Sequence, residues 1–209
     1  LLVWDLEHPE RFWMVLLKPQ PRSWLVRGGF LITGYGAVLA AHLALGWWGR
    51  GDLTRPLAVL GGPLALGAAV YTAFLLAQAR ARDLWQSPLL APHLTVQAFL
   101  AGAGALLLAG RGGEGAFLTG VLAGSALLHL LLAMGEVLVG HPTAHARLAV
   151  RNMIAGPWTG AFWGGLGLTA AGASLASTSL APLGAAAALL GLFLYEHAYV
   201  QAGQSVPLA

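Results

Sequence analysis

A tyrosine lies inside one of the long apolar runs of this sequence, at a depth where its hydroxyl can meet a ligand. The run begins near Leu57 and ends at Gln78, where a segment rich in arginine follows. Tyr71 lies about two helical turns before Gln78, which is about 10 Å at a rise of about 1.5 Å per residue. A phenol at that depth can donate a hydrogen bond to a molecule that enters from the apolar phase. Tyr71 is therefore a candidate binding residue.

Carboxylates and imidazoles form a second set of candidates, because both groups exchange protons. Ionisable groups inside an apolar phase are costly and tend to be functional. His129 lies two turns deeper than Glu136 on the same helical face. The candidates for proton transfer share a place near one end of the apolar runs or in the first polar segment: Asp5, Glu7, His129, Glu136, Glu196 and His197.

Each candidate also has a simpler interpretation. Glu136 and Glu196 can pair with arginines or a histidine at the ends of their runs. His129 can form a hydrogen bond between helices, as polar side chains in packed membrane helices often do. Tyr71 can be a packing aromatic. The sequence alone leaves these interpretations open.

The elements that must position these residues are membrane helices. The chain has 209 residues, of which 57% are hydrophobic and only 9% charged; a soluble domain carries about 25% charged residues. The mean hydropathy is +0.71. A chain with so few charges cannot cover a surface that faces water. The net charge of +3 does not indicate a nucleic-acid partner.

The chain contains no cysteine, which limits its redox chemistry. Thiolates are the usual ligands of iron–sulfur clusters, so no cluster is expected in this chain. An electron carrier would have to be a haem, a quinone or a centre held by a partner.

The apolar runs predict an all-α fold, a polytopic transmembrane helical bundle forming a single membrane domain over residues 1–209. A helix needs about 20 apolar residues to cross about 30 Å of hydrocarbon. Six complete spans are expected, at about 24–48, 57–78, 89–109, 116–139, 157–176 and 180–200. Short interfacial helices are expected at about 9–18 and 143–153, and Ser23 and Thr143 are expected to cap helices. The apolar residues 1–4 are interpreted as the tail of an earlier span, so the chain is expected to be a fragment.

The predicted spans divide the positive charges unevenly between two faces. Side A is the face with residues 5–22, the loop 80–88, the segment 141–152 and the C-terminus. Eight of the 11 Lys and Arg residues fall on side A, and three fall on side B. The excess predicts that side A faces the cytoplasm.

Four motifs in order resemble the NrfD/polysulfide reductase membrane-subunit family. They begin with Asp5-Leu6-Glu7-His8-Pro9-Glu10-Arg11-Phe12 and Pro21-Arg22-Ser23-Trp24, and the segment from Tyr71 to Pro88 follows. The others are Glu136 with His141-Pro142-Thr143-Ala144-His145-Ala146-Arg147, and Tyr195-Glu196-His197 with Gln201-Ala202-Gly203-Gln204. The resemblance covers essentially the whole chain.

The resemblance implies a haem-free anchor subunit in the bacterial or archaeal cell membrane that serves anaerobic respiration. Such a subunit exchanges electrons and protons with a quinone, either menaquinone or ubiquinone, and contributes the quinone site rather than a complete enzyme. Tyr71 matches the family tyrosine that bonds the quinone head group. Asp5 matches the acid of the first junction.

The implied partners are a four-cluster ferredoxin-like iron–sulfur subunit and, through it, a molybdopterin oxidoreductase or a multihaem cytochrome. The resemblance places this partner on side A, which in polysulfide reductase faces the periplasm, so the orientation stays open. The residues of side A expected to dock the partner are Arg11, Arg22, Arg80, Arg82, Trp85, Arg147 and Arg151.

Two other functions are compatible with the residues. A di-haem cytochrome b anchor would take histidines from facing helices, such as His129 and His197. A secondary transporter or ion channel would be expected to carry an inverted repeat with broken helices. The break at Gly61-Gly62-Pro63 has no counterpart at a matching offset.

Overall fold

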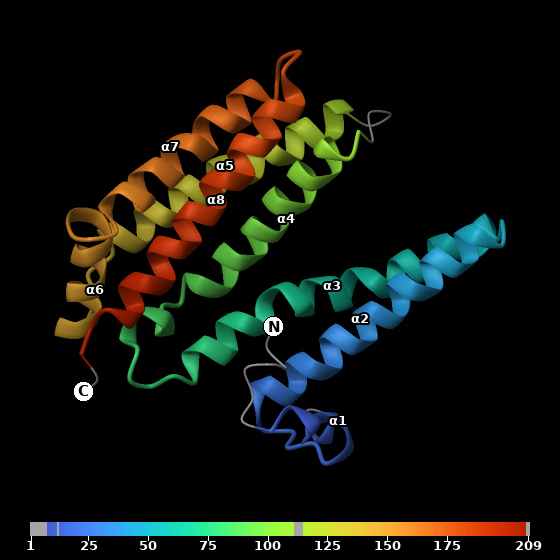
Figure 1. The fold of residues 1–209 in the computed structure, drawn as a ribbon, viewed down its shortest axis with the longest axis horizontal. Helices are drawn as coiled ribbons and strands as arrows, with labels where there is room; N and C mark the ends of the chain where they lie inside the picture. The colour runs from blue at the N-terminus through green and yellow to red at the C-terminus, as the bar shows by residue number, and fades with distance from the viewer. Residues whose placement is uncertain (1–7, 12, 111–114, 208–209) are drawn as a thin grey trace. The chain divides into compact units, whose positions relative to one another are not determined.

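The computed structural model describes residues 8–11, 13–110 and 115–207, and within these residues every regular element is a helix. The short helices are η1 (Pro9–Arg11), α1 (Met14–Leu17), η2 (Gly51–Leu53), η3 (Asp83–Gln86) and α6 (Ala144–Ala155). The long helices are α2 (Trp24–Trp47), α3 (Thr54–Ala77), α4 (Leu90–Leu108), α5 (Gly115–Leu138), α7 (Thr159–Leu175) and α8 (Ala181–Gln204) (Figure 1). The predicted all-α membrane fold is confirmed.

Five helical segments have the length and hydropathy of membrane spans. They are Trp24–Trp47, Gly51–Ala77, Leu90–Leu108, Gly115–Leu138 and Ala181–Gln204. The remaining predicted span corresponds to α7, whose 17 residues measure about 26 Å. A count of six spans therefore stays a prediction. The predicted tail of an earlier span lies outside the described residues.

The chain divides into two compact units, residues 1–75 (unit 1) and 76–209 (unit 2). In unit 1, α2 and α3 form an antiparallel hairpin through a turn at Gly49, which has a φ of 70°. The ring of Trp24 stacks on Phe74, with 4.3 Å between centroids. At the other end of the hairpin, His42 Nε2 donates to the carbonyl of Thr54 over 2.9 Å. The single membrane domain over residues 1–209 stays a prediction.

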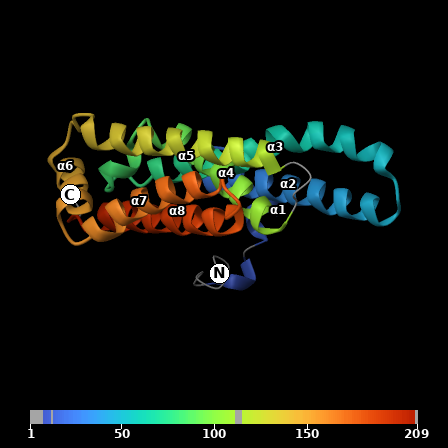
Figure 2. The ribbon, with the colours of Figure 1, turned by 90° about the horizontal axis from the view of Figure 1, so that it is seen from above.

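Unit 2 packs α4, α5, α7 and α8 side by side, with α6 at one end (Figures 1 and 2). The closest pair is α7 and α8, where glycines let the two backbones touch. A Cβ at Gly165 would lie 2.7 Å from the backbone nitrogen of Tyr195 and 2.8 Å from the carbonyl oxygen of Gly191. Such contacts are the usual role of small residues between helices in lipid. They fix the position of Tyr195.

The two predicted helix caps have different outcomes. Thr143 Oγ1 accepts from the amide of Ala146 over 3.2 Å, so the prediction for α6 is confirmed. Ser23 occupies the N-cap position of α2 with an extended backbone, but its hydroxyl forms no capping bond, so that prediction was wrong. The described residues of the predicted interfacial segment 9–18 form η1 and the four-residue α1.

Candidate functional site

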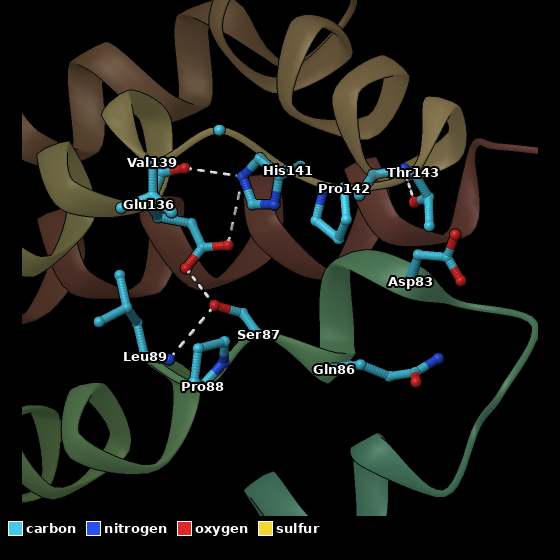
Figure 3. Close-up of a pocket in the computed structure, with 12 residues that line it drawn as sticks. Asp83, Gln86, Ser87, Pro88, Leu89, Glu136, Val139, His141, Pro142 and Thr143 are labelled. Atoms are coloured by element: carbon cyan, nitrogen blue, oxygen red, sulfur yellow. Dashed lines mark hydrogen bonds and ion pairs between the residues drawn. The ribbon is translucent and has the colours of Figure 1, made fainter.

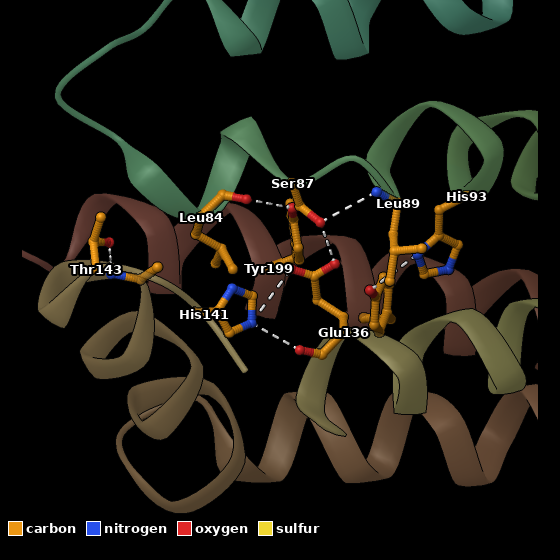
Figure 4. Close-up of polar contacts among 10 residues, drawn as sticks. Leu84, Ser87, Leu89, His93, Glu136, His141, Thr143 and Tyr199 are labelled. Atoms are coloured by element: carbon orange, nitrogen blue, oxygen red, sulfur yellow. Dashed lines mark hydrogen bonds and ion pairs between the residues drawn. The ribbon is translucent and has the colours of Figure 1, made fainter. Parts of the chain in front are cut away.

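Among the described residues of unit 2, Glu136 is the carboxylate with the least exposed surface: it lies in the last turn of α5 with 2% of its surface exposed. The hydroxyl of Ser87 donates to its Oε2 over 2.6 Å. Ser87 Oγ in turn accepts from the amide of Leu89 over 3.3 Å. Ser87 thus joins the segment before α4 to the end of α5 (Figure 4).

The other carboxylate oxygen, Glu136 Oε1, has no hydrogen-bond partner among the described residues. Its neighbour is His141 Nε2 at 3.7 Å. That nitrogen carries its hydrogen, because it bonds to the backbone carbonyl of Glu136 over 2.8 Å and a carbonyl only accepts. A histidine therefore lies beside the Glu136 carboxylate, as the simpler interpretation expects, but its hydrogen bond goes to the Glu136 backbone carbonyl.

A cavity of about 470 Å³ lies against Glu136 at the side-A end of unit 2. The segment 83–89, the end of α5, the connection 140–143 and Ala146 form its walls (Figure 3). Apolar side chains such as Leu89, Val139 and Pro142 line much of it. Pockets of about 300–1,000 Å³ with an apolar lining and a few placed polar groups are typical of small-molecule sites.

Deeper in unit 2, three buried side chains from three helices form a hydrogen-bonded chain. His93 of α4 and His129 of α5 approach within 2.8 Å, from Nε2 to Nδ1. The hydroxyl of Tyr195 on α8 lies 3.3 Å from His93 Nδ1. All three residues are buried, with at most 3% of the surface of each exposed. The far nitrogen, His129 Nε2, has no partner among the described residues.

The hydrogen bonds among Tyr195, His93 and His129 can run in either of two directions. Tyr195 donates to His93 and His93 to His129, or both bonds are reversed. Each imidazole is then neutral, with one nitrogen as a donor and the other as an acceptor. Conversion between the two directions moves one hydrogen along each link, and it requires one proton delivered to the Tyr195 oxygen and one released from His129 Nε2. The arrangement is suited to a proton relay, and its bonds between α4, α5 and α8 also match the simpler interpretation of His129.

Glu196 and His197 lie in different surroundings on α8. Glu196 is half-buried, and Gln97 of α4 donates to its Oε1. His197 is exposed, and its ring meets that of Trp158 edge-on at 5.4 Å between centroids. His129, by contrast, faces His93 and Tyr195. Asp5 and Glu7 lie outside the described residues.

Tyr71 lies in unit 1, where its ring covers Gly28 of α2 and leaves no room for a side chain there. The side chain is half-buried. In the described part of the chain, tyrosine hydroxyls bond to protein groups at Tyr195 and Tyr199, and that of Tyr71 does not. The ring of Tyr71 is therefore fixed by its contact with Gly28, and its hydroxyl has no hydrogen-bond partner among the described residues.

The residues expected to dock a partner differ in their surroundings. Arg11, Arg22, Arg80 and Arg151 are exposed. Arg147 is also exposed, and it donates to the carbonyls of His141 and Pro142. Arg82 donates to three carbonyls at the end of α8, those of Gly203, Gln204 and Val206. Trp85 is 9% exposed and packs against Gly203. A docking role for all seven stays a prediction, but Arg82 and Trp85 already have partners inside unit 2.

Sequence reasoning missed several residues of unit 2 that complete the site: Ser87, His93, Gln97, His141 and Tyr195. A signal for two of them was present, because His93 and Gln97 stand one turn apart within an apolar run. Polar groups at this spacing share a helical face. Their partners on α5 and α8 follow only from the packing.

The comparison with known families agrees with the motifs. The family model described as "Polysulphide reductase, NrfD" matches residues 1–206. No curated protein and no solved structure matches the chain significantly. The family match covers nearly the whole chain, and the helical architecture with five candidate spans is that of an integral membrane protein. The chain therefore belongs to the polysulphide reductase NrfD family.

Proposed function

We propose that this chain is the quinone-interacting membrane anchor of a multi-subunit respiratory oxidoreductase. In this function it exchanges electrons between the quinone pool and an iron–sulfur partner. The family match over residues 1–206 is the observation that carries the proposal, since NrfD proteins belong to complexes with iron–sulfur and molybdenum subunits. The quinone supplies the redox chemistry, and the chain supplies binding, orientation and protons.

Tyr71 is the proposed quinone-binding residue. A quinone carbonyl accepts a hydrogen bond, and the Tyr71 hydroxyl is a donor with no protein partner among the described residues. The fit of the ring over Gly28 supports a fixed direction for this bond. The quinone is menaquinone or ubiquinone.

The proposed proton-transfer residues are Asp5, Glu7, His129, Glu136, Glu196 and His197. For His129 and Glu136 the support is structural, because each is buried and has one unpartnered polar atom. Proton transfer by the other four rests on their residue types and positions in the sequence.

The proposed partner is a four-cluster ferredoxin-like subunit that leads to a molybdopterin oxidoreductase or a multihaem cytochrome. It would dock on side A, where Arg80, Arg147 and Arg151 are exposed. The proposed location is the bacterial or archaeal cell membrane.

The test is the Tyr71→Phe variant in the assembled complex. Loss of one hydrogen bond to the head group is expected to lower quinol-dependent turnover about tenfold, the equivalent of about 1.4 kcal/mol. Turnover with an artificial electron donor to the partner subunit should not change. Both rates are measured on the same preparation.

Tyr35→Phe is the matched control, because Tyr35 is also a half-buried tyrosine of unit 1. It should retain full quinol turnover, and both variants should co-purify with the partner. Equal quinol turnover in the Tyr71→Phe and Tyr35→Phe variants would remove Tyr71 from the quinone site.

A further inference from the structure

The cavity at the side-A end of unit 2 offers an incoming group one carboxylate, that of Asp83. Two carboxylates belong to its lining, and Glu136 is closed off, because its Oε2 bonds to Ser87 and its Oε1 is buried. Asp83 is only half-buried, and in Figure 3 no hydrogen bond or ion pair reaches its side chain. No lysine or arginine is among the described residues that line the cavity. The accessible charge inside the cavity is therefore negative.

The other polar side chains of the lining already have partners. The hydroxyl of Ser87 donates to Glu136, and the amide of Gln86 donates to the carbonyl of Arg80 over 3.1 Å. His141 Nε2 donates to the carbonyl of Glu136. Much of the remaining wall is apolar, from Pro88, Leu89, Val139 and Pro142.

A lysine or arginine side chain has the form that this lining accepts. Its methylene stem packs on apolar surface while its charged end seeks a polar partner. The volume of about 470 Å³ greatly exceeds the space that one water needs, so the cavity can admit a side chain of this length.

The surface around the cavity carries the opposite charge. Arg80 and Arg147 are exposed, and Arg147 is anchored on the carbonyls of His141 and Pro142, which both line the cavity. A partner that matches this face is acidic around its edge and carries one cation at its centre. Opposite charges arranged in this way fix the register of two proteins.

We infer that the iron–sulfur partner inserts one lysine or arginine side chain into this cavity, where its cationic end pairs with the carboxylate of Asp83. The inference rests on the proposed function, because it names the contact that positions the partner of that function. The walls are the connecting segments before α4 and after α5, at the end of the helices where a protein can dock. An ion pair enclosed by an interface acts mainly on dissociation, whereas charges at the rim act mainly on association.

The experiment measures the rates at which the iron–sulfur subunit binds to the chain and leaves it. The subunit that co-purifies with the chain is stripped off, checked by its iron content, and rebound to the chain immobilised in nanodiscs. Asp83→Asn keeps the shape of the side chain and removes its charge. This variant should raise the dissociation rate about tenfold or more and leave the association rate nearly unchanged. Asp83→Glu retains the charge and should stay close to the wild type.

Two controls separate the cavity from the surface charge around it. Arg80→Gln, at the rim, should lower the association rate and its dependence on salt, with an unchanged dissociation rate. Asp52→Asn removes an exposed acid that bonds to Arg50 in the turn between α2 and α3, and it should change neither rate.

The outcomes separate this inference from the proposed function. If Asp83→Asn leaves the dissociation rate unchanged or lowers it, no cation of the partner pairs with Asp83, and the inference is overturned while the proposed function stands. If phosphatidylethanolamine co-purifies in a manner that depends on Asp83 and the dissociation rate does not change, the cation is a lipid ammonium group, which also overturns it. If no iron–sulfur subunit co-purifies with the wild-type chain, the proposed function and this inference fail together.

Discussion

The chain formed by His93, His129 and Tyr195 shows how a single buried residue can organise three helices. His93 stands in the middle, and both of its ring nitrogens have partners. Its neighbours have no other hydrogen-bond partners among the described residues, because His129 Nε2 is unpartnered and the single hydroxyl of Tyr195 faces His93. Loss of His93 would therefore leave two buried polar side chains unsatisfied.

A His93→Leu variant is expected to be less stable by about 1–3 kcal/mol, the cost of orphaned buried polar groups. The free energy of unfolding can be measured by titration with a denaturing detergent. His197→Leu is the control, because His197 is exposed and should tolerate the change. Equal stability of the two variants would show that the hydrogen-bonded chain contributes little to folding.

At the scale of residues, the sequence predicted the burial of a side chain better than it predicted the hydrogen-bond partner of that side chain. The lengths of the apolar runs placed His129 and Glu136 in a membrane helix, and both side chains are buried in the structure. The partners His93 and Ser87 were not predicted, since they are 36 and 49 residues away in the chain and meet them only through helix packing.

At the scale of elements, the pairing of α7 with α8 depends on glycines that face the neighbouring backbone. Adjacent glycines on α7 differ in this respect. A Cβ at Gly165 would overlap the backbone of α8, whereas a Cβ at Gly164 would meet nothing within 4 Å. The two positions therefore form a natural test of backbone contact.

Gly165→Ala is expected to destabilise unit 2 by about 1–3 kcal/mol, the usual cost of overpacking. Gly164→Ala should be neutral or slightly stabilising, because alanine favours a helix over glycine. Unfolding of both variants in detergent, followed by circular dichroism, gives the comparison. A Gly165→Ala variant as stable as Gly164→Ala would mean that α7 and α8 can separate at little cost.

The positions of the helices were also predictable from the sequence, but the side chains that cap them were less so. The expected spans 24–48 and 89–109 correspond closely to α2 and α4. The side chain of Thr143 caps α6 as predicted, while that of Ser23 does not cap α2, because the residue type alone does not orient a hydroxyl. Arg82 was expected to dock a partner, and its bonds to the end of α8 depend on a contact across 121 or more residues.

At the scale of the whole molecule, the number of membrane crossings depends on α7. This helix is short for a span, yet α8, its partner in the tightest packing, has the length and hydropathy of one. If α7 crosses, the turn between α7 and α8 lies on the opposite face from α6. The excess of arginine and lysine on side A favours the cytoplasm for α6, whereas the family resemblance favours the periplasm, so the orientation stays open.

The absence of cysteine makes this topology directly testable. Single cysteines at Gln86 and at Ser177 are expected to react with an impermeant maleimide from opposite faces of sealed vesicles. Gln86 is exposed before α4, and Ser177 is exposed in the turn before α8. Labelling of both from the same face would show that the number of crossings between them is even, and the prediction of six spans would be wrong.

The hydrogen bonds from Arg82 to the carbonyls at the end of α8 have a practical consequence for purification of this protein. Val206 is buried, and its carbonyl accepts from Arg82, which directly precedes Asp83 of the cavity wall. A tag inserted next to Val206 would lie near Arg82, and therefore close in sequence to the cavity wall at Asp83 and Gln86. Purification handles are better inserted at the opposite pole, in the turn at Ser177 and Thr178, where both side chains are exposed.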